Sequence, residues 1–134
     1  MKKDIVINDA TYIAIAIVPD KNEHGEDEWS AYFFNFKDTE IENVLINASA
    51  SGVVDGEEKH TATVRFFIEK LEPLSYKKFE AILPEALRLN NRYWVSYYEG
   101  KEIFEKKFII AADMNVPDNF MMVPFLNKPG LIVQ

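Results

Sequence analysis

Residues Arg92–Ile110 read RYWVSYYEGKEIFEKKFII, and this stretch decides the fold class. Large side chains occupy every second position of RYWVSYY, and Phe104, Phe108 and Ile110 resume the alternation after Glu99–Lys101. A period of two is typical of a β-strand, because successive side chains of a strand point to opposite faces. Two such runs joined by a short glycine-containing connection predict a β-hairpin.

The same period recurs along most of the chain. Ala31–Ile46 reads AYFFNFKDTEIENVLI, in which the polar KDTE separates two apolar runs, so a strand, a turn and a second strand are expected. Both faces of Glu28–Phe36 are largely apolar, which favours a central position in a sheet. Further strands are predicted over Tyr12–Val18, His60–Lys70 and Ser75–Leu83.

Helix signals are confined to Pro84–Asn91, where proline opens a short run of helix formers. The pattern therefore predicts an all-β protein: one immunoglobulin-like antiparallel β-sandwich over residues 1–134, with about seven strands and one short helical turn. The spacing of Leu89 and Tyr93 resembles a tyrosine corner, in which the hydroxyl binds backbone; the alternative is an ordinary strand residue. The apolar segment Phe120–Val133 is expected to pack as extended chain on its own domain or on a second subunit.

Composition limits the partners and the compartment. The chain has 134 residues and a net charge of −7, and its basic pairs are too short to form a phosphate-binding surface, so we expect neither nucleic acid nor a membrane as partner. The absence of cysteine excludes disulfides and thiol nucleophiles. Asp4, Asn8 and Asp9 interrupt any signal-peptide core, and Tyr12–Val18 is far shorter than a membrane span. These features favour a cytoplasmic protein.

No stretch carries a recognisable catalytic or metal-binding motif. His24 and His60 lie in or beside polar loops, and the sequence has no G-x-S-x-G elbow and no phosphate-binding glycine loop. In the loop that begins at Asp20, Asp20, Asn22 and Gly25 fit the first, third and sixth positions of a calcium loop. His24 replaces the oxygen ligand at the fifth position and Ala31 the acidic residue at the twelfth, so we expect no calcium site at Asp20–Glu28. We therefore predict no catalytic residue, no metal site and no cofactor.

Large apolar side chains are the remaining candidates for a binding surface. The candidates are Trp29, Phe33, Phe67, Trp94, Tyr98, Phe120, Met121, Met122 and Phe125. Aromatic residues and methionine dominate many protein interfaces, although the same residues also build cores. We expect a non-catalytic binding or protein-interaction module with a protein partner or a homodimer contact. The alternative is an enzyme, or an accessory subunit of one, that uses loop carboxylates.

Several segments resemble a small family of uncharacterised bacterial proteins of about this length. The segments are MKKDI, WSAYFFN, IENVLI, LEPLSYKKFE and LNNRYWVSYYEGKEIFEKKF, and together they extend over most of the chain. Some proteins of this family carry the label phenylalanyl-tRNA synthetase alpha subunit. A synthetase active site needs arginine-bearing ATP motifs, which have no counterpart here, so the resemblance transfers neither an activity nor a functional residue.

Overall fold

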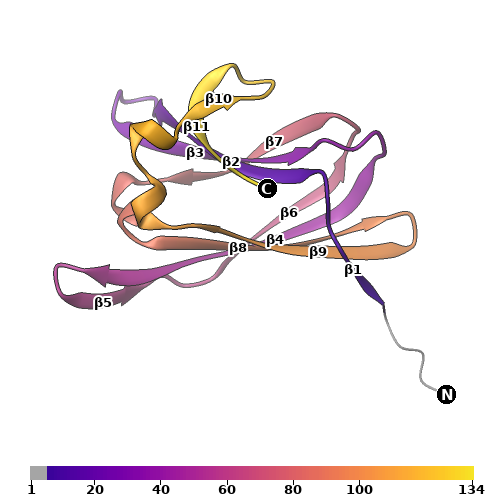
Figure 1. The fold of residues 1–134 in the computed structure, drawn as a ribbon, viewed down its shortest axis with the longest axis horizontal. Helices are drawn as coiled ribbons and strands as arrows, with labels where there is room; N and C mark the ends of the chain where they lie inside the picture. The colour runs from indigo at the N-terminus through magenta and orange to yellow at the C-terminus, as the bar shows by residue number, and fades with distance from the viewer. Residues whose placement is uncertain (1–5) are drawn as a thin grey trace.

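The computed structural model describes residues 6–134, which form two β-sheets and contain no α-helix. Figure 1 shows the sheets as two layers. The described residues form eleven strands, more than the seven or so predicted. The strands are β1 (Ile7–Asp9), β2 (Ile13–Lys21), β3 (Asp27–Asn35), β4 (Ile41–Val54), β5 (Glu57–His60), β6 (Val64–Leu71), β7 (Ser75–Ile82), β8 (Asn90–Glu99), β9 (Glu102–Ile110), β10 (Met121–Val123) and β11 (Lys128–Val133).

One layer is a six-stranded sheet in the order β1-β9-β8-β4, with β5 and β6 both beyond β4. The predicted hairpin is confirmed as β8 and β9, in which Tyr97 lies opposite Phe104 with the two rings stacked 5.4 Å apart. The long strand β4 pairs with β6 over Ile41–Ala48 and with β5 over Ser51–Val54. The β4–β5 hairpin projects beyond the rest of the sandwich (Figure 1).

The second layer is a five-stranded sheet in the order β10-β11-β2-β3-β7. The predicted central position of β3 is confirmed, because it pairs with β2 on one side and β7 on the other. The two strands predicted within Ala31–Ile46 also form, but they belong to different sheets. The polar KDTE turn therefore carries the chain from one layer to the other.

The main core lies between the two sheets. Isoleucines of β2 and Phe33 of β3 face Val44, Ile46 and Val95 of the opposite sheet, and all of these side chains are buried. Complete burial of one such side chain stabilises the fold by about 1.5–3 kcal/mol. Phe66 lies at the margin of this core, half-buried, with its ring 5.3 Å from that of Phe79.

Two predicted elements differ in extent from the observed ones. The single strand expected over His60–Lys70 is divided, because β5 ends at His60 and β6 begins only at Val64. Thr61 bridges the break by accepting a hydrogen bond from the Ala50 N–H at its Oγ1 and donating its own N–H to the Ala50 carbonyl. The one predicted helical turn is the 3₁₀ turn η1 (Pro84–Arg88), and two more, η2 (Ala112–Met114) and η3 (Pro117–Asn119), lead to the C-terminal strands.

The apolar C-terminal segment packs on its own domain. β11 pairs antiparallel with β2, and β10 folds back against β11. Leu131 is buried in the main core between the sheets, and Val123 is buried in a second cluster with Ala14, Ala16 and Phe34. Packing of extended chain on the same domain, one of the two predicted destinations, is therefore the arrangement observed.

Candidate functional site

The nine candidate binding residues occupy three separate places. Phe33 is 0% exposed between the sheets, so its ring packs the core and offers no surface. Trp29 and Phe120 form an edge-to-face pair with ring centroids 5.8 Å apart, half-buried at the margin of the same core. The remaining six are exposed, on the outer face of the six-stranded sheet and around the β10–β11 connection.

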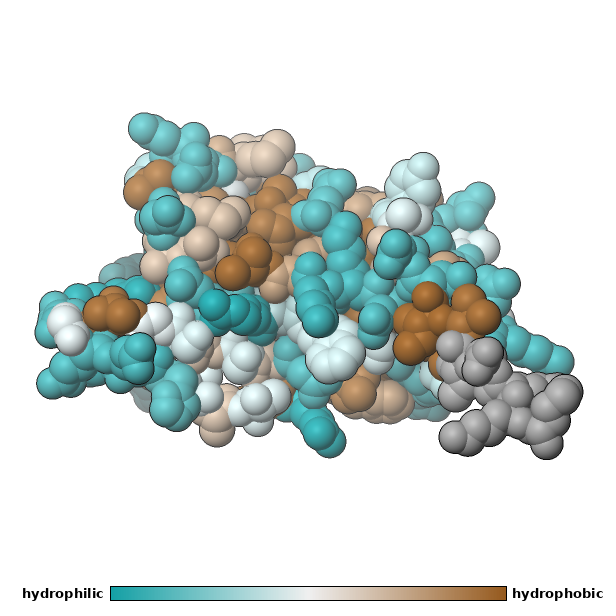
Figure 2. Space-filling model, turned by 60° about the horizontal axis from the view of Figure 1, so that its bottom comes forward, coloured by the Kyte–Doolittle hydropathy of each residue, from teal (hydrophilic) through white to brown (hydrophobic). Residues whose placement is uncertain are grey.

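Phe67, Trp94 and Tyr98 lie on the outer face of the six-stranded sheet, where Phe67 is opposite Leu45, Tyr98 is opposite Ile103 and Trp94 has polar partners. The indole N–H of Trp94 donates a hydrogen bond of 3.1 Å to Glu105 Oε2, and Lys107 Nζ lies 5.1 Å from the Trp94 ring centre. Figure 2 shows this side as mainly hydrophilic surface with separate hydrophobic areas. Large apolar side chains scattered singly are ordinary on a protein surface.

The outer face of the five-stranded sheet is different, because its rings form a continuous group. Ala14 and Ala16 of β2 lie opposite Phe34 and Tyr32 of β3, and these small side chains leave room for the rings. Phe34 is fully buried here, on the side of the sheet away from the main core. Around it lies what we call the aromatic patch, which consists of Tyr12, Phe36, Leu74, Tyr76 and Phe125.

Ring contacts connect Phe36, Tyr76 and Phe125 with one another and with Phe34. Phe125, in the turn after β10, is stacked against Tyr76 at 5.9 Å and Phe34 at 6.4 Å, and lies 6.0 Å from Phe36. Tyr12, Leu74 and Phe36 border a shallow depression whose other lining residues are polar or charged: Lys37, Asp38, Thr39 and Glu99. Aromatic pairs at such distances contribute about 0.5–1.5 kcal/mol beyond burial of their area.

Three members of the aromatic patch have a left-handed backbone. Tyr12, Leu74 and Phe125 have φ angles of 58°, 51° and 67°. The carbonyl of Tyr12 accepts the Phe36 N–H, and the N–H of Leu74 donates to the Lys37 carbonyl, so two of these residues are held on either side of Phe36–Lys37. A large non-glycine residue at positive φ costs about 1–3 kcal/mol, and such strain is concentrated at functional sites. Tyr12 is nevertheless 72% exposed and Leu74 60%.

Only Phe125 of the aromatic patch is among the sequence-predicted candidates. Alternation divides β3 into two apolar faces and does not say which one is outward. The register provides that information, because Phe33 lies opposite Ile15 whereas Phe34 lies opposite Ala14. Isoleucines mark the core face of β2, so the rings beside alanines had to point outward.

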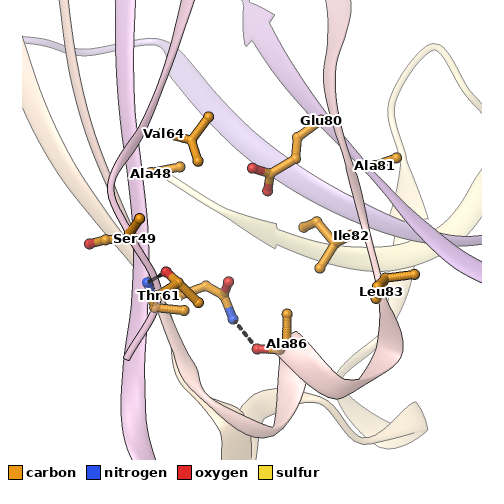
Figure 3. A pocket seen from close by; sticks show the side chains of 12 residues that line it. Ala48, Ser49, Thr61, Val64, Glu80, Ala81, Ile82, Leu83 and Ala86 are labelled. Carbon is orange, nitrogen blue, oxygen red and sulfur yellow. Dashed lines mark hydrogen bonds between the residues drawn. The ribbon is translucent and has the colours of Figure 1, made fainter. Parts of the chain in front are cut away.

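A cavity of about 260 Å³ lies between the two sheets at one lateral edge. Its walls come from β4, the β5–β6 break, β7 and η1, as Figure 3 shows. Many of the lining side chains are small: Ala48, Ala50, Ala62, Ala81 and Ala86. The break between β5 and β6 and these alanines together leave the space unfilled.

A β-bulge turns Glu80 into this cavity. Ala31 pairs with Glu80 but the next residue, Tyr32, pairs with Lys78, so Phe79 has no partner in the register. Phe79 packs on the main core and Glu80 points into the cavity, so both consecutive side chains face the interior (Figure 3). Bulges commonly redirect a side chain in this way beside functional sites.

Burial raises the pKa of the Glu80 carboxyl, and the neighbouring Tyr93 hydroxyl offsets part of that shift. The hydroxyl itself is buried and makes no hydrogen bond of good geometry within residues 6–134. Burial and the nearby Glu80 charge raise the pKa of Tyr93 as well. The tyrosine corner suggested by the Leu89 and Tyr93 spacing was wrong, because this hydroxyl faces a carboxylate and binds no backbone group.

No family model matches the sequence, and no curated protein matches it. Within residues 6–134, no three His, Cys, Asp or Glu side chains gather closely enough to hold one metal ion. The described helical turns are also too short to cross a membrane.

Proposed function

We propose that the protein is a non-catalytic interaction module that binds a protein partner through the aromatic patch. The observation that carries this proposal is the coincidence of strain and exposure at Tyr12 and Leu74. The strain lowers stability, and glycine at either position would remove both the strain and the exposed apolar side chain. Aromatic anchors in a connected apolar surface are the groups that dominate protein interfaces.

Two methionines of β10 are candidates to extend the proposed surface; as consecutive strand residues they point to opposite faces, so one of them can join it. Met121 and Met122 precede Phe125 in the chain and are largely exposed. Methionine adapts its shape to a partner because it is unbranched and flexible. A protein partner with apolar side chains matches this set of groups better than nucleic acid does, since the chain is acidic overall.

An enzyme, or an accessory subunit of one, is the weaker candidate. It would use the cavity that contains Glu80, where the lining residues within 6–134 include no second carboxylate. Glycosidic acid–base catalysis uses two carboxyl groups that act together, and the described lining of this cavity offers only Glu80.

The proposal includes an immunoglobulin-like architecture and a cytoplasmic location. Seven strands support the architecture: β2, β3 and β7 are adjacent in one sheet, and β6, β4, β8 and β9 follow in that order in the other. If these seven strands are renumbered 1 to 7 in chain order, the two sheets have the orders 1-2-5 and 4-3-6-7. The two sheets of an immunoglobulin constant domain have the orders 1-2-5-4 and 3-6-7. Only the fourth strand changes sheet, and β1, β5, β10 and β11 are additions. The location remains a prediction.

The test compares two double variants that alter opposite faces. Tagged wild-type protein, Tyr12→Gly/Leu74→Gly and the control Phe67→Ser/Trp94→Ser are used to capture proteins from native cells, followed by quantitative mass spectrometry. We expect a partner that the wild type and the control retain and that the patch variant loses. Loss with the control alone, or retention by the patch variant, contradicts the proposal. Sedimentation of the purified proteins shows whether the partner is a second copy.

A further inference from the structure

We infer that the lateral cavity is a second binding site, which takes a small apolar ammonium ion with its nitrogen on the Glu80 carboxylate. This site is independent of the aromatic patch, because it lies between the sheets and the patch lies on an outer face. The inference rests on the size of the cavity, on its unused hydrogen-bond capacity and on its charge.

The size suits a compact ligand. A cavity of about 150 Å³ is large enough for a benzene ring. The volume here is about 260 Å³, and the site is open to solvent: Ala48 and Ile82 provide buried apolar wall, and Val64 and Leu83 form its exposed rim. Glu80 projects between these walls (Figure 3). A short hydrocarbon chain or a ring therefore fits beside the carboxylate.

Glu80 and Asn91 bring free acceptors to the site, while the hydroxyls of Ser49 and Thr61 can both donate and accept. The Asn91 amide nitrogen already donates to the carbonyls of Ala86 at 2.9 Å and Leu89 at 3.1 Å, which leaves its oxygen for a ligand. The two Glu80 oxygens accept only, when the group is ionised. An ammonium group has three donors and no acceptor, so it complements these atoms, whereas a carboxylate ligand would be repelled.

The charge of the site is uncompensated. The described residues that line the cavity include no lysine, arginine or histidine, and Glu80 is the acidic one among them. Tyr93 of β8 is the titratable group that faces Glu80, while the lining groups of β4, η1 and the β5–β6 break are uncharged. A half-buried carboxylate without a cation is destabilising unless a ligand supplies the opposite charge.

Titration calorimetry with three probes of equal size tests the inference. We expect n-butylammonium to bind wild-type protein at pH 7 at least tenfold more tightly than n-butanol, and n-butyrate to show no binding. Glu80→Gln should weaken n-butylammonium at least tenfold, while the control Glu85→Gln, an exposed position on η1, should leave it unchanged. Equal affinity for n-butanol, no binding of n-butylammonium, or full binding to Glu80→Gln would overturn the inference.

Two further readouts separate ligand binding from a structural role for Glu80. Replacing an uncompensated carboxylate by an amide should raise the melting temperature of the free protein at pH 7, so the variant is expected to remain folded. Wild-type affinity for n-butylammonium should also decrease at least tenfold as Glu80 takes up a proton at acidic pH. A lower melting temperature of Glu80→Gln, or an affinity independent of pH, would contradict the assignment.

Discussion

The outer faces of the two sheets both have aromatic rings but use them differently. On the six-stranded sheet, Phe67 and Trp94 are exposed among charged neighbours, and Lys107 lies over the Trp94 ring. On the five-stranded sheet, Phe34 is fully buried beneath the C-terminal strands, and Phe125 is stacked against it. One face is ordinary surface, and the other is a second small core that opens into the aromatic patch. Whether a ring is exposed or buried depends on which segments pack over it, and amino-acid composition does not specify that packing.

Removing the C-terminal strands β10 and β11, which cover Phe34, is expected to have the largest effect on stability. Truncation after Asn119 deletes β10 and β11, so it exposes Ala14, Ala16 and Phe34 and leaves β2 without a neighbour on one side. We expect a loss of at least about 5 kcal/mol in the free energy of unfolding, which is comparable to the whole stability of many domains. Urea denaturation followed by circular dichroism measures it. An unchanged urea midpoint would show that β10 and β11 do not stabilise the five-stranded sheet.

A single ring on each face provides the next comparison. Phe34→Ala should cost about 3–5 kcal/mol, because it leaves a cavity in a packed cluster. Phe67→Ala should change stability by no more than about 0.5 kcal/mol, since Phe67 is 62% exposed. Equal losses in urea denaturation would mean that the two faces are alike.

The lateral cavity differs from both outer faces because its Glu80 carboxyl is expected to make stability depend on pH. Because burial raises the pKa of Glu80 above its ordinary 4.5, its contribution to stability is complete below that value and decreases as pH rises through the folded-state pKa. Glu80→Gln should therefore melt higher relative to wild type at pH 7 than at pH 4. Exposed Glu85→Gln should show no such trend. If the melting temperatures of Glu80→Gln and wild type differ by the same amount at pH 4 and pH 7, Glu80 is not a desolvated carboxyl.

The smallest expected effect concerns backbone strain. Leu74→Gly relieves a positive φ of 51° and should raise the free energy of unfolding by about 0.5 kcal/mol, after the added entropy of the unfolded chain is subtracted. Ser96→Gly, on the outer face of β8, should instead lower it by about 0.5–1 kcal/mol. Differential scanning calorimetry compares the two. If Leu74→Gly lowers the free energy of unfolding as much as Ser96→Gly does, the backbone of Leu74 is not strained.

Much of the fold could be predicted from alternation, and most of the candidate sites could not. The β8–β9 hairpin, the central place of β3 and the short turn at Pro84–Arg88 follow from local patterns. Alternation does not determine which face of β3 is covered, because that depends on β2 and on distant strands. It also assigns Glu80 to the same face as Lys78, and only the bulge at Phe79 turns the carboxyl inward.

Photo-cross-linking in native cells tests most directly whether the aromatic patch is the binding face. Benzoylphenylalanine replaces Tyr12 in one protein and Trp94 in the other, two exposed aromatic positions on opposite outer faces. The account predicts a discrete cross-linked product from position 12 and none from position 94. A product from position 94 alone, or the same product from both, would contradict it.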